Sequence, residues 1–261
     1  QLMHDEELER RLNTEILYDR LHLYPLAGMF YGLTALLGLF ALRGVRRTQT
    51  ATTIVLTLAC ALHTTAIAMR VAILNRPPVG TLYESLLFVG LIIGLVCLVI
   101  SASSRKPALA LGGALGSALL LALAPLFETD GESLTMLSAV LNTNFWLVTH
   151  VLCITAGYGL CIVTALLAHG LLTVAPRRTD NPAGKALLYR LSLISLLLTT
   201  VGTLLGGVWA DQSWGRFWGW DPKENGALLI VLWLLWLQHG RLGGQLSHLA
   251  WLSGCAFLTV I

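Results

Sequence analysis

Long apolar runs separated by short polar segments make up most of the 261-residue chain. A helix needs about 20 consecutive apolar residues to cross a bilayer. Eight runs follow this pattern: 23–42, 51–74, 82–101, 108–127, 145–175, 191–209, 222–240 and 248–261. The last holds 14 residues, or about 21 Å of helix against a hydrocarbon core of ~30 Å, so we expect it to stop inside the span. The pattern predicts an all-α polytopic membrane protein with about eight transmembrane helices.

The segment before the first run has a different pattern. Leu8, Leu12 and Ile16 recur at helical spacing among charged residues, which is typical of an amphipathic helix. We therefore divide the chain into an extracytoplasmic arm, residues 1–22, and a helical membrane domain, residues 23–261. The arm is either a lead-in from a preceding segment or a surface helix, and the sequence leaves both open.

Composition and charge agree with a membrane protein. Hydrophobic residues make up 56% of the chain and charged residues 12%, whereas soluble domains carry roughly a quarter charged residues. The formal net charge of +3 is too small to indicate nucleic-acid binding. Lys and Arg gather in one set of alternate loops, as they do in cytoplasmic loops. This asymmetry predicts that the N-terminus and the loops 75–82, 128–144 and 210–221 lie on the extracytoplasmic side.

Half of the eight tryptophans fall in one predicted external loop, residues 209–224, which reads WADQSWGRFWGWDPKE. One or two such rings would suit an interfacial belt, but four of them interleaved with glycine also suit a surface for a flat ligand such as heme. Two cations on the loop could pair with heme propionates. Both interpretations stay open on physical grounds. The rings are Trp209, Trp214, Trp218 and Trp220, and the cations are Arg216 and Lys223.

The end of this loop carries a helix-start signature. Asp221, Pro222 and Glu224 are the residues expected at N-cap, N1 and N3 of a capped helix. We expect this cap to fix the loop that carries the tryptophan rings.

Two segments resemble one known family. The sequence WGRFWGWDPKENGALLIVLWLLWLQHGR, residues 214–241, resembles the tryptophan-rich WWD signature of heme-handling membrane proteins, and its DPKE and downstream His-x-Arg resemble the CcsA branch. RPPVGTLYESLLF, residues 76–88, is similar to the segment that precedes an early span in that family. The two segments occur in the expected order. The chain thus resembles CcsA-type cytochrome c biogenesis proteins, including the C-terminal part of ResC and CcsBA proteins.

Two histidines match heme ligands of that family. His150 lies one turn inside a span, with Trp146 four residues earlier on the same helical face. From the residues alone it is either an axial heme ligand or an interfacial histidine bonded to a neighbouring helix. The resemblance implies that His150 is an axial ligand, that the opposite histidine follows beyond Ile261, and that His239 is an intramembrane ligand where heme enters. His63, in the second span, matches no family position.

The resemblance implies a function. Heme b would be held at the extracytoplasmic face by Trp209, Trp214, Arg216, Trp218, Trp220, Asp221 and Lys223, with iron bound by His150 and His239 at two sites. The chain would then be a cytochrome c synthase (heme lyase) subunit that presents heme to the CxxCH thiols of apocytochrome c, without a catalytic residue separable from heme binding. The implied partners are a CcsB/ResB-like membrane subunit and a thiol-reducing pathway. The implied location is a bacterial inner membrane, with a thylakoid as the alternative.

Three other interpretations remain. CcmC-like or CcmF-like heme delivery proteins share the tryptophan motif. A b-type membrane cytochrome would carry electrons without releasing heme. A structural or transport subunit with an aromatic belt would bind no heme.

Overall fold

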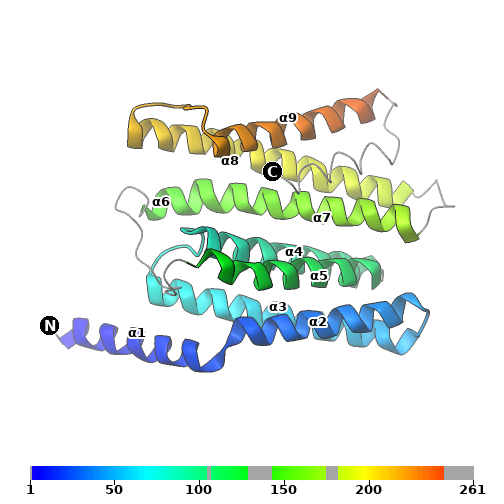
Figure 1. The fold of residues 1–261 in the computed structure, drawn as a ribbon, viewed down its shortest axis with the longest axis horizontal. Helices are drawn as coiled ribbons and strands as arrows, with labels where there is room; N and C mark the ends of the chain where they lie inside the picture. The colour runs from blue at the N-terminus through cyan, green and yellow to red at the C-terminus, as the bar shows by residue number, and fades with distance from the viewer. Residues whose placement is uncertain (1, 105–106, 129–142, 175–181, 244–261) are drawn as a thin grey trace. The chain divides into compact units, whose positions relative to one another are not determined.

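The computed structural model describes residues 2–104, 107–128, 143–174 and 182–243, and these form helices without a strand (Figure 1). The chain divides into two compact units, Gln1–Asn144 and Phe145–Ile261. Unit 1 contains α1 (Leu2–Leu21), α2 (Leu23–Leu42), α3 (Arg46–Leu74), α4 (Leu82–Ser104), α5 (Pro107–Leu123) and the 3₁₀ turn Ala124–Phe127. Unit 2 contains α6 (Asn144–Trp146), the π-turn Leu147–Val151, α7 (Leu152–Val174), α8 (Pro182–Trp214) and α9 (Pro222–Leu242). The all-α fold predicted from the sequence is confirmed.

The predicted spans are largely present as helices. Among the described residues, six helices are long and apolar enough to cross a membrane: Glu9–Leu42, Thr48–Leu74, Leu82–Ser103, Pro107–Phe127, Asn144–Ala168 and Pro182–Trp214. The expected seventh span forms α9, but polar groups at both ends of that helix lower its apolar character. The expected eighth span, residues 248–261, lies outside the described residues. The chain is therefore a polytopic helical membrane protein.

Unit 1 is built around four long helices. α2 packs against α3 and α5, and α4 packs against α5 and α3 (Figure 1). Their shared core is apolar and rich in small side chains, which let membrane helices approach closely. Its buried residues include Ala27, Tyr31, Leu56, Ala59, Cys60, Leu87, Ala110 and Ala114.

The predicted arm forms the helix α1, and a sharp break separates it from α2. His22 adopts the left-handed conformation at this break, with φ 44° and ψ 47°. α1 packs on α3, and Tyr18 accepts a hydrogen bond from Arg70 on that helix at 3.2 Å. Leu12 and Ile16 of the predicted apolar stripe are exposed, so these two side chains do not pack on α3.

A buried ion cluster joins the end of α3 to the start of α4. The Glu84 carboxylate accepts hydrogen bonds from Arg70 at 3.0 Å and from Arg76 at 2.6 Å. It also accepts from the backbone N–H of Gly80 at 2.8 Å, and its side chain is fully buried. Removing one partner of such a cluster leaves an uncompensated buried charge. Glu84 therefore clamps the turn formed by the RPPVGTLYES segment.

Unit 2 is a three-helix layer in which α8 packs against both α7 and α9. Cys161 of α7 and Ile230, Leu234 and Leu237 of α9 form its buried apolar cluster. Side-chain hydrogen bonds also join the helices: Gln238 donates to Ser192 at 2.8 Å, and Ser195 donates to the Gly157 carbonyl at 2.9 Å. Polar contacts of this kind are favoured between membrane helices, because lipid cannot satisfy them.

The tryptophan loop is shorter than we expected. α8 continues to Trp214, so only residues 215–221 between α8 and α9 are non-helical instead of 209–224. Gly215 ends α8 with φ 66°, and its N–H bonds to the Asp211 carbonyl at 2.8 Å. Because the polar residues Asp211 and Gln212 are solvent-exposed on this last turn, they do not end the helix.

The Glu84 cluster yields a stability prediction. Glu84→Gln should lower the free energy of unfolding by about 3–5 kcal/mol, because Arg70 and Arg76 keep their charge while the carboxylate is lost. Denaturant unfolding in mixed micelles, followed by the far-UV circular dichroism of the helices, measures the change. Ser103→Ala is the control, because the Ser103 hydroxyl is exposed and bonds only to its own helix at the Val99 carbonyl. Equal stability of the two variants would contradict the clamp.

Candidate functional site

His150 lies in a π-turn, Leu147–Val151, at the start of the long helix α7. Single π-turns within helices are rare and are frequent at functional sites. Nδ1 of His150 lies 2.7 Å from the carbonyl oxygen of Gly202 on α8. Since a carbonyl can only accept, Nδ1 carries the proton, and in the neutral ring Nε2 then carries the lone pair. Among the described residues, Nε2 makes no hydrogen bond.

The imidazole of His150 rests directly on α8. A Cβ atom placed on Gly206 would lie 2.6 Å from Cε1 and 3.2 Å from Nε2 of His150. Real Cβ contacts are not this short, so the ring occupies space that a side chain at position 206 would need. The absence of a side chain at Gly206 is what allows the ring to reach the Gly202 carbonyl.

An aromatic row continues from His150 along α8. Trp209 lies 5.7 Å from the His150 ring between centroids, and it stacks on Trp146 at 6.3 Å with an interplanar angle of 13°. Trp214 follows at 6.4 Å from Trp209. Trp209 is only 9% exposed, whereas Trp214 is 55% exposed. Trp209 therefore packs inside unit 2, and Trp214 presents its ring at the surface.

The loop rings do not lie in one plane. Trp218 and Trp220 meet edge to face, with centroids 6.2 Å apart and an interplanar angle of 82°. Trp220 has a φ of 58° and is 70% exposed, so the turn itself directs this ring outward. The Nε1 donor of Trp218 is buried and has no acceptor among the described residues. The loop thus offers one exposed indole face and one unused buried N–H donor.

The predicted cap at the start of α9 is confirmed. Asp221 is the N-cap and accepts from the Glu224 N–H at 2.9 Å, while Pro222 holds the first turn. Glu224 in turn accepts from the backbone N–H of Gly219 at 2.6 Å and of Asp221 at 3.3 Å. Asn225 donates to the Trp220 carbonyl at 2.9 Å. These bonds fix the backbone that carries Trp218 and Trp220.

The two cations of the loop are exposed. The guanidinium of Arg216 folds over Gly219, where it occupies the place of a side chain at that position. Lys223 lies in the first turn of α9. Both charges are therefore available to an acidic group bound near the loop.

His239 lies near the other end of α9. Its Nδ1 is 2.9 Å from the Leu235 carbonyl of its own helix, so Nε2 again carries the lone pair of the neutral ring. The ring is exposed on the same face as Leu232, Leu235 and Trp236. The preceding residue, Gln238, bonds to Ser192, which is ten residues before Gly202 on α8. The structure therefore separates His239 from His150 by about 15 Å along α8.

His63 is fully buried inside unit 1. Its Nδ1 lies 3.3 Å from the Tyr31 hydroxyl, and the ring meets Tyr24 and Tyr31 edge to face. His63 is therefore packed in the core between the helices of unit 1. Within the described residues, no group of three or more His, Cys, Asp or Glu side chains could hold a metal ion.

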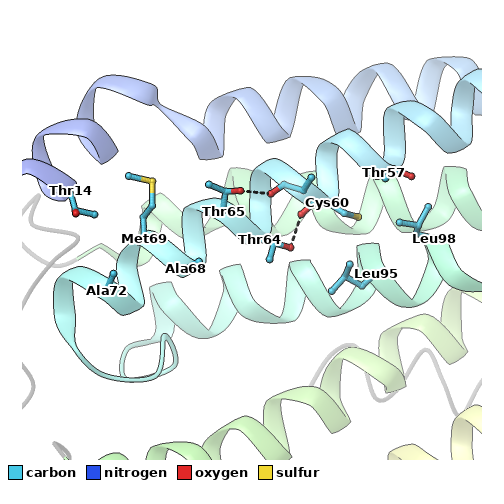
Figure 2. A pocket seen from close by; sticks show the side chains of 11 residues that line it. Thr14, Thr57, Cys60, Thr64, Thr65, Ala68, Met69, Ala72, Leu95 and Leu98 are labelled. Atoms are coloured by element: carbon cyan, nitrogen blue, oxygen red, sulfur yellow. Dashed lines mark hydrogen bonds between the residues drawn. The ribbon is translucent and has the colours of Figure 1, made fainter. Parts of the chain in front are cut away.

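Unit 1 also contains an open groove of about 680 Å³ along α3 (Figure 2). Its lining is apolar and offers no imidazole. The Thr64 and Thr65 hydroxyls bond to carbonyls of their own helix, so their methyl groups contribute to this surface. The lining residues are Thr14, Thr57, Cys60, Ala61, Thr64, Thr65, Ala68, Met69, Ala72, Leu95 and Leu98. The groove is thus suited to an apolar chain.

Several of these features have no signal in the sequence. The Gly202 carbonyl, the space at Gly206 and the π-turn have no motif. Glu84 lies in the RPPVGTLYES segment, whose resemblance to the family did draw attention to it. Its partner Arg70 lies in the preceding apolar run, and no sequence pattern connects the two residues.

Comparison with known proteins identifies the family. Residues 79–261 match the family described as Cytochrome C assembly protein. Protein NrfI of Wolinella succinogenes is 30% identical over 254 residues, which cover 90% of this chain and 27% of NrfI. The cytochrome c biogenesis protein CcsA of Prochlorococcus marinus (strain MIT 9312) is 28% identical over 77% of this chain and 75% of that protein.

A third relative matches over a shorter region. CcsA of Chlamydomonas reinhardtii is 34% identical over 125 residues, which cover 44% of this chain and 35% of that protein. The chain thus spans about a quarter of NrfI and about a third of this CcsA. The family match covers well over half of the chain. The chain belongs to the cytochrome C assembly protein family and is an integral membrane protein of the CcsA type.

Proposed function

We propose that this chain holds heme b at its extracytoplasmic face through His150 and presents it for covalent attachment to apocytochrome c. The proposal rests mainly on the tautomer of the His150 ring. Its Nδ1–H is committed to the Gly202 carbonyl, which leaves Nε2 as the basic nitrogen. Neutral imidazole nitrogen is a standard axial ligand of heme iron.

Residues of α8 and of the tryptophan loop have side chains of the kinds that such a cargo requires. A porphyrin needs an apolar aromatic surface, and the indole rings of Trp214 and Trp220 are exposed. The buried Nε1–H of Trp218 has no acceptor among the described residues, so it could donate a hydrogen bond to a propionate or to another acceptor. Arg216 and Lys223 could neutralise the propionates. Asp221 and Glu224 would act indirectly, by holding the loop backbone in place.

The chemistry of attachment requires little from the protein beyond positioning. Each cysteine thiol adds across one heme vinyl group: a carbon–sulfur bond forms, the vinyl double bond becomes a single bond, and the thiol hydrogen goes to the other vinyl carbon. No net electrons are transferred, but the thiols must be reduced beforehand. The chain would supply orientation and iron ligation, which can lower a barrier by bringing reactants together in the right geometry.

The proposal includes a second heme position at His239. This imidazole is exposed on an apolar face of α9. An ionisable side chain within a membrane is a functional candidate. A histidine from a CcsB/ResB-like partner would complete that site. The opposite ligand at the outer site would be a second histidine. If heme binds at both sites, it would enter near His239 and then move toward His150. The membrane would be a bacterial inner membrane or a thylakoid.

His150→Gly tests iron ligation in the purified full-length protein. We expect heme affinity to fall by about 100-fold or more, because loss of a ligand should exceed the 10–100-fold effects of losing outer-shell partners. Added imidazole should restore the heme and its Soret spectrum. Thr149→Ala is the control, since Thr149 lies in the same π-turn and bonds only to Phe145. Unchanged heme occupancy in His150→Gly would overturn the assignment.

Reconstitution with heme, a reductant and a CxxCH peptide tests the function. We expect thioether-linked heme, measured by the pyridine hemochrome shift and the peptide mass, with an AxxAH peptide as the negative control. Heme transfer without a covalent product would instead indicate a CcmC-like or CcmF-like delivery protein. Heme that stays bound through repeated reduction and oxidation would indicate a b-type electron carrier.

A further inference from the structure

The α8 surface under His150 combines two features that act on the same ring. The Gly202 carbonyl binds Nδ1 at 2.7 Å, and Gly206, one turn later, provides the space in which the ring lies. Positions four residues apart share a helix face, so both contacts come from one side of α8. The ring is thereby held both by a hydrogen bond and by close packing.

The π-turn supplies the third constraint. Residues Leu147–Val151 form a wider turn than an α-helix, which changes the direction of the side chains relative to those of α7. This turn packs against α8. His150 therefore reaches α8 from a backbone whose local geometry differs from the rest of the helix.

We propose that Gly202 and Gly206 are positioning residues that fix the tautomer and direction of His150, so that Nε2 is the nitrogen presented to iron. This inference rests on the proposed function. Metal-binding histidines commonly donate their other ring N–H to a carbonyl, which orients the ring and makes it more basic. Here the acceptor is a backbone carbonyl, which no substitution at position 202 removes. A side chain at position 206 can instead displace the ring from it.

A methyl group at position 206 would displace the imidazole. The new Cβ would lie 2.6 Å from Cε1 and 3.0 Å from Nδ1, so the ring has to move away from α8. Such movement lengthens or breaks the 2.7 Å bond to Gly202. The ring then no longer has a fixed tautomer, and either nitrogen can face the iron.

Gly206→Ala in the full-length protein tests this inference, with Gly157→Ala as a matched control. A Cβ at Gly157 would lie 2.8 Å from Cγ2 of Thr199, so this variant disturbs the same α7–α8 interface without touching His150. Heme is measured per mole of monodisperse protein, and the iron ligands are identified by low-temperature electron paramagnetic resonance. We expect heme retention to weaken about 10- to 100-fold in Gly206→Ala, with restoration by added imidazole.

The comparison of variants decides the outcome. Equal heme retention and equal spectra in Gly206→Ala and Gly157→Ala would overturn the positioning role. If Gly206→Ala does not fold, replacement of His150 by Nδ-methylhistidine removes the Nδ1–H donor directly; altered axial ligation supports the inference and unchanged ligation overturns it. The proposed function fails separately, when His150→Gly itself keeps its heme.

Discussion

The geometry of unit 2 depends on one partly buried hydrogen bond, from Nδ1–H of His150 to the carbonyl of Gly202. The bond requires a glycine at position 206, because the ring lies where a side chain would be. It also requires the π-turn that aims the ring at α8. Trp209 then packs beside the imidazole and stacks on Trp146. Along α8, this packed row ends at Trp214, whose ring is exposed.

Each unit has a turn between two helices that is stabilised by a glutamate, but the partners of the glutamate differ. In unit 1, the Glu84 carboxylate is matched by Arg70 and Arg76, and the cluster secures the turn between two spans. In unit 2, the cap of α9 secures the tryptophan turn through Glu224, whose carboxylate takes two backbone N–H groups. Each device replaces water where an unpaired group would cost free energy. In both turns, hydrogen bonds from backbone N–H groups to a glutamate carboxylate hold the backbone in place.

The sequence predicted what depends on local pattern. Apolar runs indicated the helices, and the Asp-Pro-Lys-Glu signature indicated the cap at Asp221 correctly. The sequence predicted a span that ends at Trp209 and an external loop that begins there, yet α8 continues to Trp214. Contacts between distant segments, such as Arg70 with Glu84 or Gly206 with His150, have no local signature, because they depend on how helices pack. The heme-binding roles remain predictions.

A structure of the full-length protein purified with heme would show which residue binds the iron. We expect iron bound by Nε2 of His150, with Nδ1 still hydrogen-bonded to the Gly202 carbonyl. Iron bound by another residue, or by His150 with its ring turned away from α8, would contradict this expectation.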